Sequence, residues 1–361
     1  MIRESLEALQ RKYGKNDLKS ALRTAGTEFV YCQSEESLRR AFPADGTGLV
    51  VITDDNIMLD YLKKLSFYDQ ERIYVVKQES IDTVNGILTH SKPTVVMGFG
   101  GGRVLDVSKM VAFRAGVPLI LAPTAPTHDG LLSRNCALFE NGKKSSYTTS
   151  YATKIIIPEY LWATAGELPK AGRLDVLSDI VALQDVSLAM AEENLVPNAR
   201  YLSLACNAIS RLLHEEDEDD LASALFFSGL AMHESSRYCS GSEHELEKLL
   251  MPILNNRYFH GQLVGTSTLL SALVYKQEAP KMPKLFFDPA ILYDELIQLF
   301  EQKGLLEYAL RPLRESDTDI VAKTLRKASS VRPERYTLWN KVDSTKVEWG
   351  GVVDTVLKLS S

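Results

Sequence analysis

The sequence has 361 residues, of which 45% are hydrophobic and 24% charged, a profile of globular proteins rather than of disordered or fibrous ones. At that length two domains are expected, because single hydrophobic cores stop growing at about 250–300 residues. The formal net charge of −6 argues against a nucleic-acid or anionic-membrane partner, which would need a basic face, but it permits a small anionic substrate.

The cysteines and the N-terminal segment indicate the compartment. Four cysteines are scattered along the chain without CxxC spacing, which favours a reducing cytoplasm over an oxidising one. The first 17 residues mix charges and lack an apolar core, so they do not resemble a signal peptide. No apolar run approaches the roughly 20 residues that a membrane-spanning helix requires. We therefore expect a soluble cytoplasmic protein.

The first 158 residues predict alternating strands and helices. Short apolar runs typical of strands occupy 48–53, 73–76, 94–98 and 118–122, and amphipathic stretches cover 81–90 and 104–114. Nearly continuous apolar strands separated by helices indicate a parallel sheet covered on both faces. Sheets of this class bind ligands at the carboxyl ends of their strands.

The pattern changes after Pro158. Helical periodicity dominates from there on, over 177–193, 199–213, 221–233, 262–275 and 290–303, with few strand candidates. We therefore predict an α/β domain over residues 1–158 and an all-helical domain over residues 159–361.

A glycine-rich segment follows the third predicted strand. The sequence GFGGGRVLDVSK at 98–109 contains three consecutive glycines between a strand and a helix. Glycines allow close approach of the backbone to a ligand, and the helix N-terminus offers free N–H donors suited to a pyrophosphate. Tight turns use glycine triplets too, but the strand before and the helix after favour a dinucleotide site. The spacing differs from GxGxxG, so the dinucleotide should be wrapped differently.

A second polar loop follows the next predicted strand. The sequence PTAPTHDG at 123–130 gathers hydroxyls, an imidazole and a carboxylate within a few residues. An ordinary turn would explain the two prolines, but the functional groups at a strand end favour a ligand site.

Two histidines in the helical half suggest a metal site. His244 follows Ser-Gly-Ser-Glu near a predicted helix start, and His260 begins the next helix, sixteen positions later. That separation allows a short helix, a turn and a return, so the two rings could meet. Two histidines with one carboxylate form a common divalent-metal set, although a single histidine is more often structural. The spacing leaves three candidates for the carboxylate: Asp175, Asp179 and Asp185.

Five segments carry a resemblance to a known family. They are GGGRVLDVSK (100–109), PTAPTHDG (123–130), SGSEH (240–244), HGQLVG (260–265) and RPERYT (332–337). In order and approximate spacing they resemble the glycerol-1-phosphate dehydrogenase branch of the iron-containing alcohol dehydrogenase and dehydroquinate-synthase-like superfamily. The resemblance implies a Rossmann-like α/β domain followed by an all-α domain, the dehydroquinate synthase-like fold.

The resemblance also implies roles for particular residues. Asp175, His244 and His260 would hold Zn²⁺ or Fe²⁺, since the same ligands accept both. Asp129 would contact the substrate. The residues implied to bind the nicotinamide dinucleotide are Gly101, Gly102, Arg103, Val104, Leu105, Asp106, Thr124, Thr127 and Ser133.

The choice of cofactor depends on Asp54, which ends the first predicted strand. It matches the acidic residue that accepts hydrogen bonds from the adenosine ribose hydroxyls in the family. A carboxylate at that place would repel a 2′-phosphate, so NAD is favoured over NADP.

The chain departs from the family pattern at two positions. Leu174 stands where the family usually has a glycine before its metal-binding aspartate. Lys248 stands where the family usually has a second histidine, four residues after His244 and therefore on the same helix face. A lysine can bind a phosphate as a point charge, and it can equally mark a different substrate.

The sequence therefore predicts a metal-dependent, NAD-linked oxidoreductase that interconverts dihydroxyacetone phosphate, or an analogue, and its alcohol of the sn-glycerol-1-phosphate type. Asp129, Asp175, His244, Lys248 and His260 are its expected catalytic residues. The alternatives are a dehydrogenase of an unphosphorylated or larger sugar-derived polyol, a cyclase like dehydroquinate synthase that uses NAD transiently, and a non-catalytic protein of the same fold. A homo-oligomer that binds no nucleic acid and no membrane is expected.

Overall fold

The computed structural model describes residues 1–14, 18–43, 48–54, 57–64, 72–131, 133–214, 218–254 and 257–360. The chain forms two compact units, and neither is continuous in sequence. The α/β unit comprises Asp17–Pro169 and Glu216–Leu230. The helical unit comprises Met1–Asn16, Lys170–Glu215 and Ala231–Ser361.

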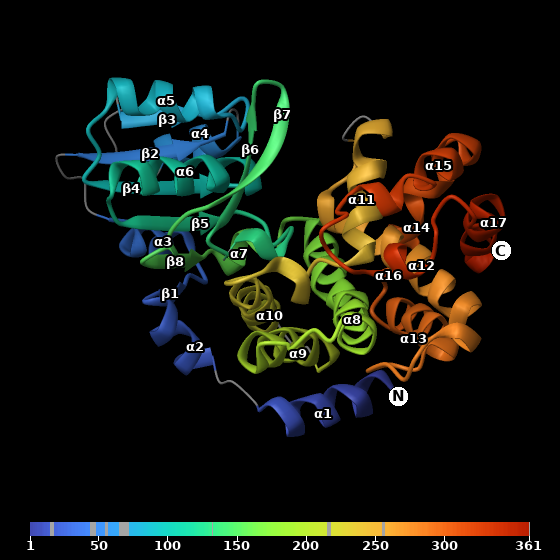
Figure 1. The fold of residues 1–361 in the computed structure, drawn as a ribbon. Coiled ribbons are helices and arrows are strands. Elements are labelled where there is room, and N and C mark those ends of the chain that lie inside the picture. The colour runs from blue at the N-terminus through green and yellow to red at the C-terminus, as the bar shows by residue number, and fades with distance from the viewer. Residues whose placement is uncertain are drawn as a thin grey trace. The chain divides into compact units, whose positions relative to one another are not determined.

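A six-stranded sheet forms the centre of the α/β unit (Figure 1). All of its strands are parallel, as the apolar runs predicted. Their spatial order is β1 (Glu28–Tyr31), β8 (Lys154–Ile157), β5 (Leu119–Pro123), β4 (Val95–Gly100), β2 (Leu49–Thr53) and β3 (Ile73–Val75). The four runs predicted as strands at 48–53, 73–76, 94–98 and 118–122 correspond to β2, β3, β4 and β5, so the fold class is confirmed.

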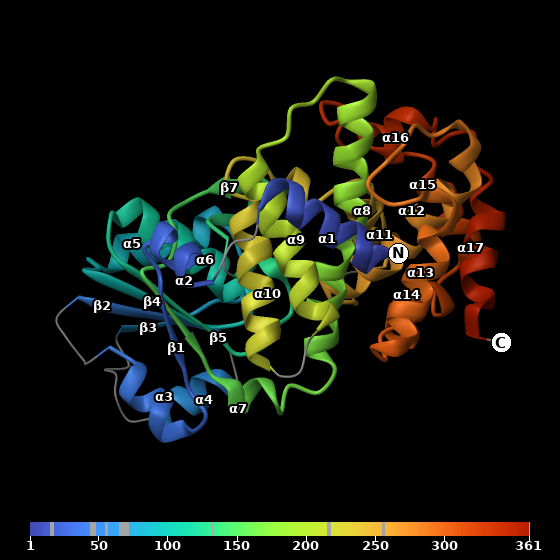
Figure 2. The same ribbon diagram turned by 90° about the horizontal axis from the view of Figure 1, so that it is seen from below.

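Helices cover both faces of this sheet. Figure 2 shows α3 (Glu35–Ala41) and α4 (Ile57–Lys64) on one face, and α5 (Ile81–His90) and α6 (Gly102–Ala115) on the other. Alternate residues of the central strands, such as Val51 of β2 and Met97 of β4, form one buried cluster with Leu38 of α3. Burial on both faces explains why these strands are apolar throughout rather than alternating.

The α/β unit also contains two short helices, α2 (Leu18–Ala25) and α7 (Glu159–Trp162), a hairpin and a late helix. Strands β6 (Asn135–Glu140) and β7 (Lys143–Thr148) form an antiparallel hairpin that was not predicted. Asn141 and Gly142 turn the chain with positive φ angles of 51° and 76°, the conformation that an Asn-Gly hairpin turn requires. Helix α10 (Glu218–Ala231) returns to this unit late in the sequence, where Phe226 packs edge-on against Phe29 of β1 with ring centroids 4.7 Å apart.

Long buried helices form the helical unit. Helix α8 (Leu168–Glu192) begins nine residues before the predicted stretch, while α9 (Ala199–Leu213) has the predicted bounds. The side chains of α12 from Gly261 to Tyr275 are all buried, so its periodicity is weak. The remaining helices are α11 (Ser242–Ile253), α12 (His260–Glu278), α13 (Pro289–Gln302), α14 (Leu306–Arg314), α15 (Thr318–Leu325), α16 (Leu338–Lys341) and α17 (Trp349–Leu357).

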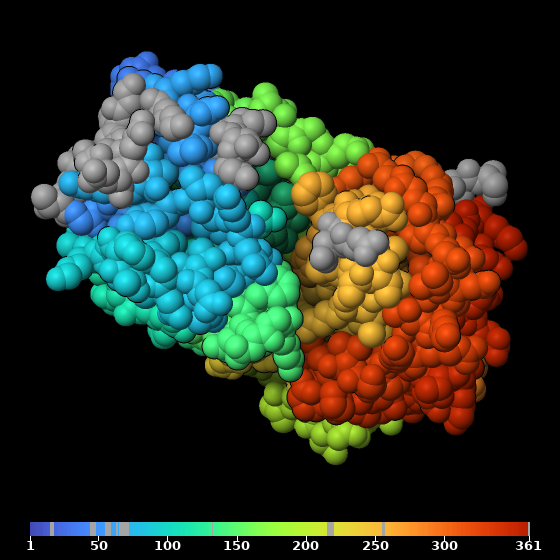
Figure 3. Space-filling view, turned by 90° about the horizontal axis from the view of Figure 1, so that it is seen from above, coloured from blue at the N-terminus to red at the C-terminus, as the bar shows by residue number. Residues whose placement is uncertain are grey.

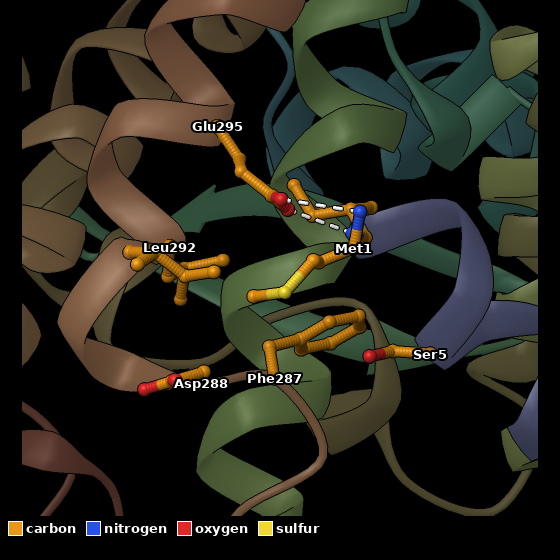
Figure 4. A pocket seen from close by; sticks show the side chains of 8 residues that line it. Met1, Ser5, Phe287, Asp288, Leu292 and Glu295 are labelled. Carbon is orange, nitrogen blue, oxygen red and sulfur yellow. Dashed lines mark hydrogen bonds and ion pairs between the residues drawn. The ribbon is translucent and has the colours of Figure 1, made fainter.

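The N-terminal helix α1 (Ile2–Tyr13) belongs to the helical unit. Its Gln10 amide donates to Asn207 Oδ1 and to Ser210 Oγ on α9, both at 3.0 Å. Figure 4 shows the beginning of α1 beside α13, where the backbone N–H of Ile2 donates to Glu295 at 2.7 Å. Residues 1–14 are thus tied to elements that lie 197 and 293 positions further along the chain.

The described helices include none that is long and apolar enough to cross a lipid bilayer. Cys32, Cys136, Cys206 and Cys239 are buried free thiols, which agrees with the absence of a disulfide pattern in the sequence.

Candidate active site

The polar motifs of the α/β unit meet at one edge of the sheet. The register pairs Thr53 with Phe99 and Gly100 with Pro123, so β2, β4 and β5 end side by side. The Thr53 hydroxyl donates to the Phe99 carbonyl at 2.9 Å, and the Thr124 N–H donates to the Gly100 carbonyl at 3.1 Å. Asp54 leaves β2 at this same edge. It is the edge at which parallel sheets bind ligands.

Helix α6 begins at this edge with its N-terminus uncapped. Gly101 is the extended N-cap residue and supplies no side-chain hydrogen bond to the first turn. The side chains of Val104 and Leu105 are buried, and the Leu105 N–H already donates to the Gly101 carbonyl at 3.1 Å, so of these two residues only Val104 offers a ligand its backbone N–H. Arg103 projects outward and pairs with Glu79 at 3.3 Å.

His128 lies against the start of α6. A Cβ atom on Gly102 would lie 3.3 Å from the Cε1 atom of the His128 ring and still closer to its Nε2 atom, so a side chain at 102 would collide with the imidazole. Thr124 and Thr127, in the same loop, are partly exposed. The predicted glycine-rich turn and the predicted polar loop are therefore neighbours in space.

A buried lysine holds the loop that carries Asp129 and Ser133. The ammonium of Lys109 on α6 donates to the carbonyls of Gly130 and Asn135, the latter at 3.0 Å. It also lies 3.7 Å from Asp106, whose other oxygen accepts from the Ala137 N–H at 3.0 Å. Burial raises the pKa of the Asp106 carboxyl, and the Lys109 charge opposes that shift. Asp106 and Lys109 thus join α6 to this loop and to the hairpin.

Asp129 and Ser133, two of the predicted site residues, have partners within the α/β unit. Asp129 begins a short 3-10 helix, is buried, and accepts from the Ser228 hydroxyl of α10 at 2.7 Å. Ser133 is also buried, and its hydroxyl accepts from the Asn135 N–H at 3.1 Å.

Three helices of the helical unit bring the predicted metal ligands together. Asp175 lies on α8, His244 on α11 and His260 at the start of α12. The Nε2 atoms of His244 and His260 lie 3.7 Å and 3.4 Å from Oδ1 of Asp175. One possible ligand atom from each residue falls within 4.8 Å of the others. Among the described residues, Asp175 is the only one of the three candidate aspartates in this group.

Each histidine is oriented by a neighbouring glutamate. Nδ1 of His244 contacts Glu243 at 2.7 Å, and Nδ1 of His260 contacts Glu247 at 3.0 Å. A carboxylate that accepts from Nδ1–H leaves the Nε2 lone pair available to a metal, which is the usual arrangement around metal-bound histidines. The sequence analysis did not identify these two glutamates, although both flank His244 within the segment SEHELE.

The donor set fits a divalent metal. Ligand atoms bound at 2.0–2.1 Å in a tetrahedral site lie about 3.4 Å apart, close to the separations of 3.4 Å and 3.7 Å measured from Asp175 to the two histidines. Two imidazoles and one carboxylate suit zinc or iron and leave a coordination position for substrate or water. The side chains present therefore fit such an ion with little rearrangement.

Asp185 anchors the helices around this centre. Its Oδ1 accepts from the Tyr275 hydroxyl of α12 at 2.6 Å and from the Leu338 N–H of α16 at 2.8 Å. Its Oδ2 accepts from the Ser242 N–H at the start of α11 at 2.5 Å. Burial and the nearby Glu243 carboxylate raise the pKa of Asp185 to about 7. The residue that spacing alone left as a possible ligand is thus the buried connection between α8, α11, α12 and α16.

The structure explains how Leu174 is accommodated. Its side chain is fully buried next to Asp175 and lies over Gly265 of α12, where a Cβ atom would come within 2.7 Å of it. The leucine on α8 therefore fills the space that a glycine on α12 leaves.

Lys248 lies one turn beyond His244 on α11. Although the side chain as a whole is exposed, loss of solvent around its ammonium, followed by repulsion from Arg332, lowers the pKa of Lys248 to about 8. Arg335 contributes further repulsion, and Glu247 and Glu245 oppose the shift. Arg332 and Arg335 belong to the RPERYT segment, to which the sequence analysis assigned no role.

Comparison with known proteins agrees with this geometry. The family described as iron-containing alcohol dehydrogenase matches residues 43–160. The chain is 30% identical to the glycerol-1-phosphate dehydrogenase [NAD(P)+] of Metallosphaera sedula, over 80% of this chain and 84% of that protein. It is 29% identical to the protein of that name from Pyrobaculum arsenaticum, with the same coverage. A probable glycerol dehydrogenase from Sinorhizobium meliloti has a similar fold, with a TM-score of 0.63 and 16% identity over 92% of this chain and 96% of that one.

The fold is that of glycerol dehydrogenases and iron-containing alcohol dehydrogenases, and a group of side chains that could hold a metal lies within it. The chain belongs to the iron-containing alcohol dehydrogenase family, in its glycerol-1-phosphate dehydrogenase group. It is therefore an enzyme, an oxidoreductase, and the non-catalytic reading of the sequence is set aside.

Proposed function

We propose that the protein interconverts dihydroxyacetone phosphate and a glycerol phosphate of the sn-glycerol-1-phosphate type, with a nicotinamide dinucleotide as hydride carrier. The cluster of Asp175, His244 and His260 carries this proposal, because it provides a divalent-metal site with an open position. The relatives named glycerol-1-phosphate dehydrogenase [NAD(P)+] support the substrate and the cofactor.

The proposed roles divide along the chain. Residues 1–158 would bind the dinucleotide, with its pyrophosphate at the uncapped start of α6 and its adenosine ribose at Asp54. The predicted contacts of Gly101–Asp106, Thr124, Thr127 and Ser133 follow from this placement. Residues 159–361 would hold the metal and the substrate.

The protein side chains prepare the metal site for catalysis. A bound Zn²⁺ or Fe²⁺ would supply Lewis-acid stabilisation of negative charge on the substrate oxygen. Glu243 and Glu247 keep the two Nε2 atoms facing Asp175 by accepting from the opposite ring nitrogens. Asp129 is proposed to contact the substrate; its hydrogen bond from Ser228 fixes the carboxylate in place.

A direct assay tests the proposal. NADH oxidation by the zinc-loaded protein would be followed with dihydroxyacetone phosphate and, in parallel, with dihydroxyacetone. We expect turnover with the phosphate and little with the unphosphorylated ketone. The reverse preference would identify a polyol dehydrogenase. If a protein that binds NAD and zinc oxidises NADH with neither ketone, the proposed substrate is wrong. Larger sugar phosphates, and a cyclisation that forms no net NADH, would then be assayed.

We expect Asp54→Asn to relax the preference for NAD over NADP. A carboxylate next to the ribose repels a 2′-phosphate, whereas an amide removes the repulsion but keeps a hydrogen-bonding oxygen. The ratio of kcat/KM with NADPH to that with NADH should rise about tenfold, corresponding to roughly 1.4 kcal/mol. Asp60→Asn, on the exposed surface of α4, is the matched control. An unchanged ratio would place the ribose away from Asp54.

We also propose that the protein is a homo-oligomer of the cytoplasm. A homo-oligomer is the ordinary state for enzymes of this size. The four buried free thiols agree with a reducing cytoplasm.

A further inference from the structure

Two arginines of the RPERYT segment converge on one residue before α11. Nη1 of Arg332 donates to the Ser240 carbonyl at 3.2 Å and to the Ser240 hydroxyl at 2.8 Å. Nη1 of Arg335 donates to the same carbonyl at 2.7 Å, and its Nη2 donates to the Ser236 hydroxyl at 3.1 Å. Both guanidinium groups are therefore held beside the segment that leads to His244.

Lys248 adds a third positive charge. It repels both guanidinium groups, as the cause of its lowered pKa shows. Burial, and then repulsion from Arg332 and Arg237, lowers the pKa of Arg335 to about 10. Lys248 and Arg335 are thus both subject to repulsion from Arg332, which is held at Ser240, two residues before α11.

These three cations form no ion pair with the carboxylates around them, although Glu245 and Glu247 act on them at longer range. Within the part of the chain that the structure describes, none of Lys248, Arg332 and Arg335 lies within 4.0 Å of a carboxylate oxygen, and the side-chain hydrogen bonds of the two arginines end on neutral serine atoms. The protein carries a net charge of −6, so such a gathering of positive charge is not a general property of its surface. Like charges held together without direct ion pairs are unfavourable, and an anion bound in contact with them would offset that cost.

A purely structural role explains part of this arrangement. The arginines could serve only to fasten residues 332–335 to Ser240. That role accounts for both arginines, but it gives no reason for Lys248, which makes no hydrogen bond or ion pair with any described residue. A bound anion would account for the presence of Lys248 beside the two arginines, whereas the anchoring role would not.

The cluster and the metal ligands share one helix. His244 and Lys248 are four residues apart on α11 and project from the same face. Figure 3 shows the yellow-orange surface around α11 continuing into the red surface of the C-terminal segment, in agreement with the packing of α11 against α15. An anionic group bound by the cluster would therefore belong to a molecule that also reaches the metal centre.

We propose that Lys248, Arg332 and Arg335 bind the phosphate group of the substrate, a phosphate monoester dianion, and so select phosphorylated over unphosphorylated ketones. This inference rests on the proposed function. The planar guanidinium groups suit bidentate contacts to two phosphate oxygens, and the lysine supplies a point charge. The substrate carbonyl would then be directed towards Asp175, His244 and His260.

The test compares Lys248→Met, Arg332→Gln and Arg335→Gln with Arg326→Gln. Arg326 is an exposed arginine that donates to the Thr345 carbonyl, so it controls for the loss of a surface cation with a backbone bond. Isothermal titration of each zinc-loaded protein with inorganic phosphate gives the affinity of the anion site. Steady-state kinetics with dihydroxyacetone phosphate and with dihydroxyacetone give the selectivity.

We expect each cluster variant to weaken phosphate binding about 10- to 100-fold, the range for one charge-assisted contact. KM for the phosphorylated ketone should rise by a similar factor, so the ratio of kcat/KM for dihydroxyacetone phosphate to kcat/KM for dihydroxyacetone should fall in each cluster variant. Arg332→Lys should recover part of the loss. Phosphate affinity and KM that match those of Arg326→Gln in all three variants would overturn the inference.

The two proposals fail in different ways. If the unaltered enzyme does not reduce dihydroxyacetone phosphate, the proposed function is wrong, and the phosphate titrations still decide whether the cluster is an anion site. If the enzyme reduces it and the variants keep the same KM, the function stands and the cluster is structural. The zinc content and the thermal unfolding midpoint of each variant show whether a loss of phosphate binding reflects the anion site or a loss of folding. Lys248→Met is the decisive variant because this side chain fastens no other described residue.

Discussion

His260→Ala should lower kcat/KM by at least about 1,000-fold and reduce bound metal to a small fraction of one ion per chain. Loss of a residue that only hydrogen-bonds a ligating histidine already lowers metal affinity or activity about 10- to 100-fold. His260 would itself supply one of three protein ligands, so its loss should cost more. Metal content by plasma mass spectrometry and steady-state kinetics on the same preparation measure both effects.

A graded series makes this prediction specific. Glu247→Gln should keep the ligand but weaken its orientation, so a loss of about 10- to 100-fold in activity or zinc affinity is expected. His90→Ala, on the exposed end of α5, should have no effect. Full metal content and activity in His260→Ala would exclude the assigned centre, and an unaffected Glu247→Gln would exclude the role of the glutamate alone.

Gly261→Ala should destabilise the protein by about 2–4 kcal/mol and weaken metal binding as well. A Cβ atom at this position would lie 2.6 Å from the carbonyl carbon of Ala171 and closer still to its oxygen, both of them backbone atoms of α8. The clash is with backbone atoms, which cannot rotate away as a side chain could, so α8 and α12 would have to separate. Such overpacking lowers the free energy of unfolding. These helices carry Asp175 and His260, so their separation pulls two ligands apart.

Urea unfolding of the metal-free protein and zinc titration measure these two consequences. Gly351→Ala is the control, because this glycine lies on the exposed side of α17 and a Cβ there meets no atom within 4 Å. An alanine inside a helix should stabilise the control by about 0.5–1 kcal/mol. Equal stability of the two variants would show that α8 and α12 can adjust at the crossing.

The central sheet could be predicted because its signal is local. Strands buried on both faces must be apolar throughout, and β2, β4 and β5 are. The missed elements lack that signal. In β7, Lys143–Thr148, the side chains alternate between exposed and partly buried, and only the Asn-Gly turn marks the hairpin. Helix α10 has the period of a helix, but nothing local indicates that it packs with residues two hundred positions earlier.

The sequence predicted which residue types form the candidate metal site. It did not predict which aspartate joins them or which side chains hold the histidines in place. Two histidines at helix starts, with motifs resembling a known family, were sufficient to select His244 and His260 as candidate ligands, and the structure brings the two side chains together. Choosing Asp175 over Asp185 from the residues alone was impossible, because both lie on α8 and the choice depends on where α11 and α12 cross it. The glutamates behind the histidines and the arginines near Lys248 depend on the same long-range packing.

The discontinuous units set an order in which the protein can fold during synthesis. All six strands of the sheet have been made by residue 157, but the Ser228 hydroxyl that binds Asp129 comes 99 residues after it. Gln10 of α1 must wait for Asn207, 197 residues later. The nascent α/β unit should therefore form first, while α1 remains without its partner helix and every metal ligand is still to be translated. Metal capture then belongs to the last stage of biogenesis, when α12 closes the centre.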